Sequence, residues 1–258
     1  MILIGLALAA GWVPLGWAGL AALGLQPAGG SWVGALTLDN FAAVTGFEPA
    51  FGAEFAYTLA VAGLATLLTV AAAFPAAYRL AQVRAAWPGR LMPGLLVLAV
   101  SPAIAYGLPL AAVLRGIGLY GTFAGLVLAS TAAQLPLALW LLRGYLAQQP
   151  PELAEAARLE GAGWLTTLLQ IGLPLAVGGI GATAVLVFVL DWNLFVLPSL
   201  LTAGPPLVLP LALRDFFAFE RDLDWPTAAA ALLLTLGPAL ALALAAARTL
   251  DRLVVRDG

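Results

Sequence analysis

The chain has 258 residues, of which 63% are hydrophobic and 9% are charged, and its formal net charge is -2. Because an ordinary soluble domain has about 45–50% apolar and about 25% charged residues, this composition excludes a water-exposed surface and predicts a membrane protein. The sequence has no Cys and no His, which excludes thiolate nucleophiles and the commonest general base and metal ligand.

The sequence also has no Lys. A phosphate-binding P-loop requires a Gly-Lys pair, so any ATP hydrolysis must take place on another polypeptide. A chain with this charge balance offers no basic surface for a phosphate backbone, and nucleic acid is not an expected partner. We therefore expect a protein that is not an enzyme and that holds no cofactor or metal.

Apolar segments near the ~20 residues that a membrane-spanning helix needs recur along the whole chain. We predict an all-α, polytopic membrane protein with about six transmembrane helices and a short cytoplasmic helix, built as a single domain over residues 1–258. The predicted spans are residues 2–25, 55–78, 91–114, 121–142, 173–201 and 225–247.

The first apolar segment is interpreted as a retained helix, because it lacks a positively charged start and is longer than the apolar part of a signal peptide. The alternative is a cleaved signal, since the small residues Ala21 and Ala22 resemble a cleavage site. Pro and Gly inside later spans are attributed to helix packing or, alternatively, to gating hinges.

Arginine positions predict the orientation, because Lys and Arg near helix ends stay preferentially in the cytoplasm. The arginines assigned to the cytoplasmic side are Arg79, Arg84, Arg90, Arg143, Arg158, Arg248, Arg252 and Arg256. The opposite side keeps Arg115, Arg214 and Arg221. The sequence thus predicts a multi-pass protein of the cytoplasmic membrane with both termini in the cytoplasm.

The cytoplasmic segment 150–172 is predicted to form a helical elbow. Pro151 and the acidic Glu152 are typical of a helix start, and Gly161 is suited to a left-handed helix end. A second short helix is expected from about Trp164 to Gln170, before Pro174 opens the next span. The residues alone leave two interpretations open, a docking elbow for another protein or a plain connecting loop.

The spacing of this segment carries a family resemblance. Glu155-Ala156-Ala157, Gly161, Ile171 and Leu173-Pro174 resemble the EAA signature of permease subunits of binding-protein-dependent ABC importers. The surrounding chain, from about Leu36 onward, resembles the carbohydrate-uptake branch, which includes the maltose permeases. Glu160 and Leu194 depart from the residues usual in the family at those positions, Asp and Glu.

The resemblance implies a mechanism in which the elbow is the coupling helix that sits on a cytoplasmic ATPase. The implied coupling residues are Glu155, Ala156, Ala157, Gly161, Ile171, Leu173 and Pro174. The implied partners are a second permease subunit, cytoplasmic ATP-binding subunits, an extracytoplasmic solute-binding protein and the membrane lipid. The expected solute is a sugar or oligosaccharide, with polyamines, anions or phosphate esters as alternatives. An ATPase-independent transporter and a membrane scaffold remain other interpretations.

Asp191, Trp192 and Asn193 form a polar triplet inside the fifth predicted span. Asp191 lies about 17 residues past Pro174, hence roughly 25 Å along a helix and in the outer half of the bilayer. An ionised Asp costs about 2.5–3.5 kcal/mol at a helix centre, so it is expected to face water or a polar partner. The triplet belongs either to the translocation pathway or gate, or to hydrogen bonds between helices.

The external loop from Thr202 to Asp224 combines aromatic and charged residues, a composition typical of protein interfaces. In the resembled family the corresponding loop reaches toward the binding protein. We therefore expect Phe217 and Arg221 to contact that partner. The alternative is that the aromatic residues rest at the membrane interface.

Overall fold

A computed structural model describes residues 2–28, 31–47, 49–83, 87–214 and 224–254. Across these residues the chain is almost entirely helical, apart from a small antiparallel pair of three-residue strands. This confirms the predicted all-α, polytopic class. The chain divides into two units: residues 1–58 with 205–241, and residues 59–204 with 242–258. Each unit is considered by itself.

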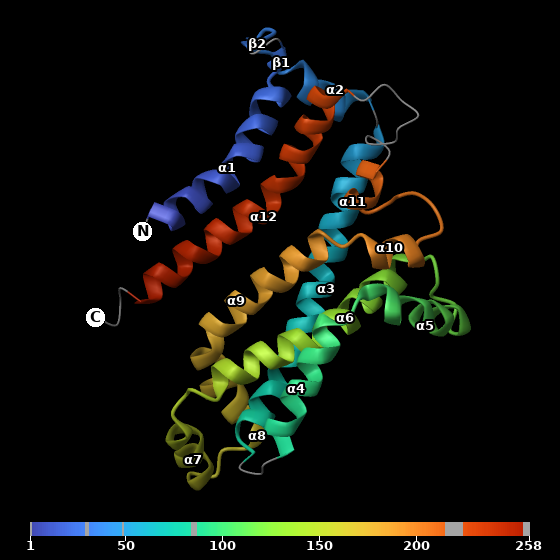
Figure 1. Ribbon diagram of the computed structural model, residues 1–258. Coiled ribbons are helices and arrows are strands. Elements are labelled where there is room, and N and C mark those ends of the chain that lie inside the picture. Colours follow the sequence, from blue (N-terminus) through green and yellow to red (C-terminus); the bar gives the residue numbers. More distant parts are fainter. Residues whose placement is uncertain (1, 29–30, 48, 84–86, 215–223, 255–258) are drawn as a thin grey trace. The chain divides into compact units, whose positions relative to one another are not determined.

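The first unit holds the N-terminal elements and most of the last helix (Figure 1). Its elements are α1 (Ile2–Ala22), β1 (Gln26–Ala28), β2 (Ser31–Val33), α2 (Asp39–Phe47), the start of α3 (Pro49–Ala81), α11 (Leu209–Ala212) and most of α12 (Trp225–Val254). Trp17 and Trp225 meet edge to face with ring centroids 5.8 Å apart. Asn40 Nδ2 donates to the Ala22 carbonyl at 2.9 Å, which fixes α2 to the end of α1.

The second unit holds the remaining helices. Its elements after α3 are α4 (Trp87–Val100), α5 (Ala103–Gly116), α6 (Phe123–Leu146), α7 (Pro151–Leu159), α8 (Trp164–Thr167), the π-helical turn η1 (Leu168–Gly172), α9 (Leu173–Trp192) and α10 (Val196–Leu201). Helix α6 packs against both α4 and α9. Within this unit, α7 and α8 lie at one end and α5 and α10 at the other (Figure 1).

A buried apolar cluster joins α3, α6 and the α8–α9 segment of the second unit. Its buried members are Ala73, Phe74, Ala77, Tyr78, Ala138, Leu142, Leu146, Leu168, Ala176 and Val187. Several are alanines, and small side chains allow membrane helices to approach closely. The cluster therefore holds the end of α3 close to the elbow.

Four helices of the described residues are long and apolar enough to span a membrane: Phe51–Ala81, Phe123–Leu146, Trp164–Trp192 and Trp225–Ala245. A fifth candidate, near the predicted span 91–114, is a pair of helices, α4 and α5, bent by 88°. Pro102 explains the break, because proline has no N–H to donate and keeps the preceding residue out of the helical conformation.

The fifth predicted span, 173–201, also differs from the structure. The apolar helix begins at Trp164, so the second short helix of the elbow is continuous with the membrane span. It ends at Trp192, and the residues up to Leu201 form the separate helix α10. The elbow and the span are thus parts of one continuous helical segment.

Candidate functional site

Helix α7 is a nine-residue helix whose ends follow from its sequence. Pro151 stands in the first turn, where a missing N–H costs nothing, and Glu152 complements the positive end of the helix dipole. Arg158 lies in the last turn, where a cation is favoured. These residues produce a short helix that is too polar to enter the membrane.

Gly161 ends α7 in a left-handed turn, as the sequence indicated. Its φ is 87°, a conformation that residues with a Cβ rarely adopt. The Gly161 N–H donates to the Arg158 carbonyl at 3.0 Å, and the Ala162 N–H donates to the Ala157 carbonyl at 2.9 Å. This pair of bonds is a Schellman motif, which satisfies the last carbonyls of α7.

The apolar residues of α7 are largely uncovered. Leu159 is 90% exposed and Leu153 is 47% exposed. Glu155, Ala156 and Gly161 are also exposed. A Cβ built on Gly161 would meet nothing within 4 Å. The helix therefore presents small and apolar residues to open space.

The structure gathers part of the predicted coupling set and leaves part of it apart. Glu155 and Ile171 line the same groove, although 16 residues separate them in sequence. Leu173 and Pro174 are exposed at the start of α9 and do not line it. Ala157 is partly buried on α7.

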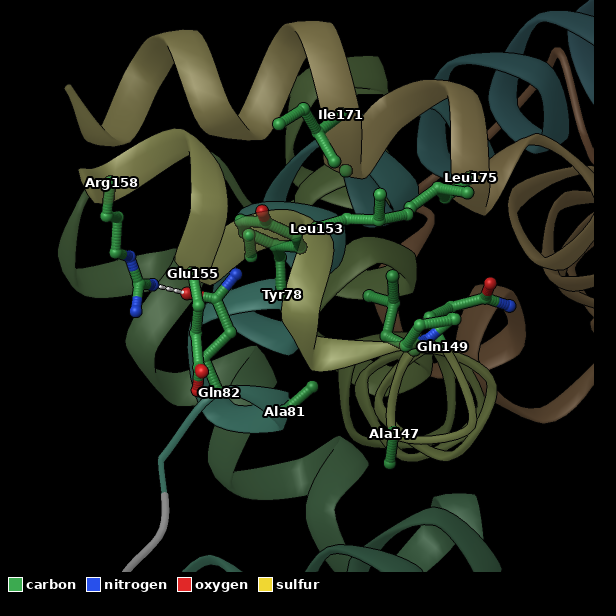
Figure 2. A pocket seen from close by; sticks show the side chains of 14 residues that line it. Tyr78, Ala81, Gln82, Ala147, Gln149, Leu153, Glu155, Arg158, Ile171 and Leu175 are labelled. Carbon is green, nitrogen blue, oxygen red and sulfur yellow. Dashed lines mark hydrogen bonds between the residues drawn. The ribbon is translucent and has the colours of Figure 1, made fainter. Parts of the chain in front are cut away.

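The groove has a volume of about 260 Å³ and lies between α7 and the ends of α3, α6 and α9 (Figure 2). Its lining residues are Tyr78, Ala81, Gln82, Leu146, Ala147, Gln149, Pro150, Leu153, Ala154, Glu155, Arg158, Ile171, Gly172 and Leu175. The Arg158 guanidinium donates a hydrogen bond to Gln82 Oε1 across its rim (Figure 2). This bond ties α7 to the residue that directly follows α3.

Tyr78 is a contact residue that the sequence did not single out. The side chain is buried, and its hydroxyl donates to the Thr167 carbonyl at 3.3 Å. A Cβ on Gly172 would lie 2.6–3.0 Å from three atoms of the Tyr78 ring. The ring therefore occupies the space above Gly172. A single tyrosine within an apolar helix belongs to no motif with a defined spacing, so the sequence alone does not mark Tyr78 as a contact residue.

The π-helical turn η1 directly precedes Pro174. In a regular α-helix, a proline ring collides with the carbonyl four residues earlier, and the proline donates no hydrogen bond. The wider turn relieves this conflict, and the Leu173 N–H donates to the Leu168 carbonyl instead. Pro174 thus explains why the helix continues through the elbow with one widened turn.

The polar triplet lies at the opposite end of α9. Asp191 is 4% exposed, and its Oδ1 accepts a hydrogen bond from Gln134 Nε2 of α6 at 3.3 Å. Asp191 Oδ2 has no hydrogen-bond partner among the described residues.

The two neighbours of Asp191 differ in exposure. Trp192 is 3% exposed and stacks on Phe188, with centroids 5.8 Å apart. Asn193 is exposed, and its Nδ2 donates to the Val189 carbonyl of its own helix at 2.7 Å. The Gln134–Asp191 hydrogen bond joins α6 to α9, and Asn193 is the exposed member of the triplet.

Two further expectations are only partly open to comparison. Phe217 and Arg221 lie outside the described residues. Three of the arginines assigned to the cytoplasm lie in the last turns of helices that end at the elbow end of the second unit. They are Arg79 of α3, Arg143 of α6 and Arg158 of α7. The arginines assigned to the cytoplasm therefore include several at the elbow end of that unit.

Comparison with known protein families gives one match that covers most of the chain. The family described as "Binding-protein-dependent transport system inner membrane component" matches residues 73–255. The matched range includes the elbow, the groove and the polar triplet.

Individual relatives are similar over about two thirds of the chain. A probable ABC transporter permease of Sinorhizobium fredii is 33% identical over 173 residues, which cover 67% of this chain and 61% of the relative. The trehalose/maltose transport system permease of Thermococcus litoralis is 32% identical over 194 residues, covering 73% and 69% of the two chains. The match thus spans less than two thirds of the first relative's length.

A solved structure matches the fold. A chain in the crystal structure of a bacterial ABC transporter involved in the import of the acidic polysaccharide alginate aligns with a TM-score of 0.79 at 16% identity. The alignment covers 96% of this chain and 93% of that chain.

Proposed function

Because the chain belongs to the family of binding-protein-dependent transport system inner membrane components, we propose that it is the permease subunit of an ATP-driven importer. The carrying observation is the elbow: a helix outside the membrane spans exposes Glu155, Ala156 and Leu159 beside an unobstructed Gly161. Exposed small and apolar residues on a short polar helix fit a surface that another protein covers.

The partner at the elbow is a cytoplasmic ATP-binding subunit, which hydrolyses ATP in place of this chain. Leu153 and Leu159 supply the apolar contact, while Ala156 and Gly161 let the partner's surface approach closely. The junction between the elbow and α9 passes the movement of the elbow on to the membrane span. This junction contains Ile171, Leu173 and Pro174. The chain itself carries out no bond-breaking step.

The remaining partners complete the pore. A second permease subunit pairs with this chain, and a solute-binding protein delivers the solute from the outside. Contact of Phe217 and Arg221 with that protein remains part of the proposal. We also propose that both termini lie in the cytoplasm, because the sequence predicts an even number of spans and the elbow end of the second unit carries Arg79, Arg143 and Arg158.

The solute is a sugar or an oligosaccharide. Support comes from relatives named for such solutes: the trehalose/maltose permease and an alpha-glucoside transport permease of Rhizobium meliloti, 35% identical over 167 residues. The low charge of the chain, 9% of its residues, also supports this solute class, since a neutral polyhydroxylated solute needs hydrogen-bonding groups rather than paired charges. Polyamines, anions and phosphate esters would instead require compensating charges.

The test is reconstitution of the complete complex in proteoliposomes with ATP inside. Binding protein loaded with maltose or trehalose is added outside, and binding protein loaded with an acidic alginate trisaccharide serves as the anionic comparison. ATP hydrolysis and labelled sugar uptake are measured. We expect hydrolysis stimulated by at least one loaded binding protein, and uptake that requires the ATPase. Uptake by this chain in liposomes without the ATPase subunit would contradict the proposal and favour an ATPase-independent transporter.

A further inference from the structure

One turn at the end of α3 contacts both limbs of the elbow. Tyr78 lies in the last turn of α3, and Gln82 directly follows that turn, with its N–H donating to the Arg79 carbonyl at 3.2 Å. Gln82 Oε1 accepts from Arg158 of α7, and the Tyr78 hydroxyl donates to the Thr167 carbonyl of α8. The elbow is therefore attached to α3 at two points, one before and one after Gly161.

The second attachment depends on a glycine. Gly172 lies between Ile171 and Leu173, at the position that the family signature leaves unspecified. A Cβ there would lie as close as 2.6 Å to the Tyr78 ring, a contact that requires a shift. Gly181, further along the same helical segment, has nothing within 4 Å of its would-be Cβ. The two glycines differ in what an added methyl group would displace.

A similar contact lies seven residues further on. A Cβ on Gly179 would lie 2.6 Å from the Tyr145 ring of α6. Residues seven apart share one face of a helix. The α9 segment is therefore held by one tyrosine from α3 at the elbow and one from α6 deeper in the bundle.

The attachment at Tyr78 coincides with the least regular turn of the segment. Thr167 directly precedes η1, and Gly172 is the last residue of that turn. A widened turn can change its hydrogen bonding more readily than a regular one, and such turns often occur at functional sites. Tyr78 therefore contacts α8 and η1 at the two ends of the widened turn.

We propose that Tyr78 and Gln82 are the positioning residues through which a displacement of the elbow is carried into α3. This inference rests on the proposed function, and it identifies α3 as the helix that moves together with the elbow. The Tyr78 ring on Gly172 and the hydroxyl bond to Thr167 hold η1 rigid against α3. Arg158 and Gln82 hold α7 to the same turn. The elbow and the end of α3 therefore move as one body.

The test compares variants in the reconstituted complex with maltose-, trehalose- or alginate-loaded binding protein. The readout is the amount of sugar taken up per ATP hydrolysed. Tyr78→Phe keeps the ring on Gly172 and removes the bond to Thr167, so this ratio should fall by about two- to tenfold, the effect of losing one hydrogen bond. Gly172→Ala should lower the ratio at least as much.

Two controls separate positioning from packing. Gly181→Ala should leave the ratio at the wild-type value, since the methyl group meets nothing. Gly179→Ala displaces a ring away from the elbow, so it should lower the yield of complex and leave the ratio unchanged. If Tyr78→Phe and Gly172→Ala lower only the yield, as Gly179→Ala does, Tyr78 is a packing residue and the inference is wrong.

A cross-link gives the converse test. The double variant Gln82→Cys/Arg158→Cys, joined by a bis-maleimide reagent, fixes α7 to α3, and the chain has no other Cys. If the two move as one body, cross-linked complexes keep sugar uptake. The inference would be overturned if the cross-linked complexes lose uptake while the same double variant without the cross-linker retains it. Failure of the wild-type complex to hydrolyse ATP in response to any loaded binding protein would instead contradict the proposed function.

Discussion

The two ends of the helical segment Trp164–Trp192 are built in opposite ways. At the elbow end, apolar residues such as Leu159 are exposed, and polar groups such as Arg158 fix the fold by hydrogen bonds. At the other end, Asp191 and Trp192 are buried, and Asn193 is exposed. An exposed apolar surface outside the membrane calls for a partner, whereas a buried polar group calls for a bond inside the bundle.

The two ends differ in how far they depend on other proteins. The Schellman motif satisfies the last carbonyls of α7, and the Gln82 bond fixes Arg158, yet the outer surface of the elbow is uncovered. The triplet is covered, yet Asp191 Oδ2 has no hydrogen-bond partner among the described residues. Changes at the elbow should therefore affect function in the assembled complex, and removal of the buried Trp192 should first affect the stability of the chain itself.

The largest expected effect is all-or-none labelling. Because the elbow end is expected in the cytoplasm, Gly163→Cys should react with a membrane-impermeant maleimide only in opened cells. Gly204→Cys, at the end of the second unit that carries α10, should react in intact cells. The chain has no native Cys, so the unsubstituted protein is the blank. Labelling of Gly163→Cys in intact cells would reverse the orientation and remove the elbow from the ATPase side.

Substitution at Gly161 should give the next largest effect. Gly161→Leu should lower uptake by more than about tenfold, because a left-handed conformation costs a non-Gly residue ~1–2 kcal/mol and the side chain fills space left for the partner. The chain should still reach the membrane. Gly163→Leu is the matched control, since its φ of -67° suits any residue. Equal ATP hydrolysis in the two variants would show that the elbow is a connector.

Trp192→Ala should destabilise the chain by about 3–5 kcal/mol, since a buried aromatic side chain stacked on Phe188 is removed. The expected result is a lower yield of complex and a lower thermal transition in detergent. Trp140→Ala is a suitable control, because Trp140 is 37% exposed on α6. A Trp192→Ala chain as stable as the Trp140→Ala chain would show that the stacking contributes little.

The smallest effect concerns the bond between Asp191 and Gln134. A double-mutant cycle with Asp191→Ala and Gln134→Leu should give a coupling energy of about 0.6 kcal/mol, the average for hydrogen bonds between membrane helices. Asn can still accept from Gln134, so Asp191→Asn alone should impair uptake more than yield. Asn193→Ala should do the same, because Asn193 is exposed and bonds only within its own helix among the contacts described. Normal uptake per complex in both would exclude the triplet from the pathway.

The elbow could be predicted from sequence because its signals are local. Pro151 and Gly161 act within one helical turn, and both ends of α7 follow from them. The all-helical class followed from composition in the same way. Family spacing then connected Glu155 with Pro174 across 19 residues.

The contacts that hold the elbow in place could not be predicted. Tyr78 and Thr167 are 89 residues apart, and nothing in either neighbourhood indicates the other. The bend between α4 and α5 was also missed, because hydropathy is continuous through Ser101 and Pro102 and a span predictor sees one apolar run. The direction in which the Asp191 side chain points depends on how α6 packs against α9. The residue pattern of a single helix does not specify that packing.

The bend has a consequence for the surrounding lipid. Helices α4 and α5 have 14 residues each, so each is about 21 Å long at 1.5 Å per residue, short of the ~30 Å hydrocarbon layer. Yet Val97, Ile104 and Leu108 along the two arms are exposed and apolar. Neither arm alone can cross a bilayer of ordinary thickness unless that bilayer thins locally, because each arm is shorter than the hydrocarbon layer. Uptake should accordingly depend on acyl-chain length, with an optimum in thinner bilayers.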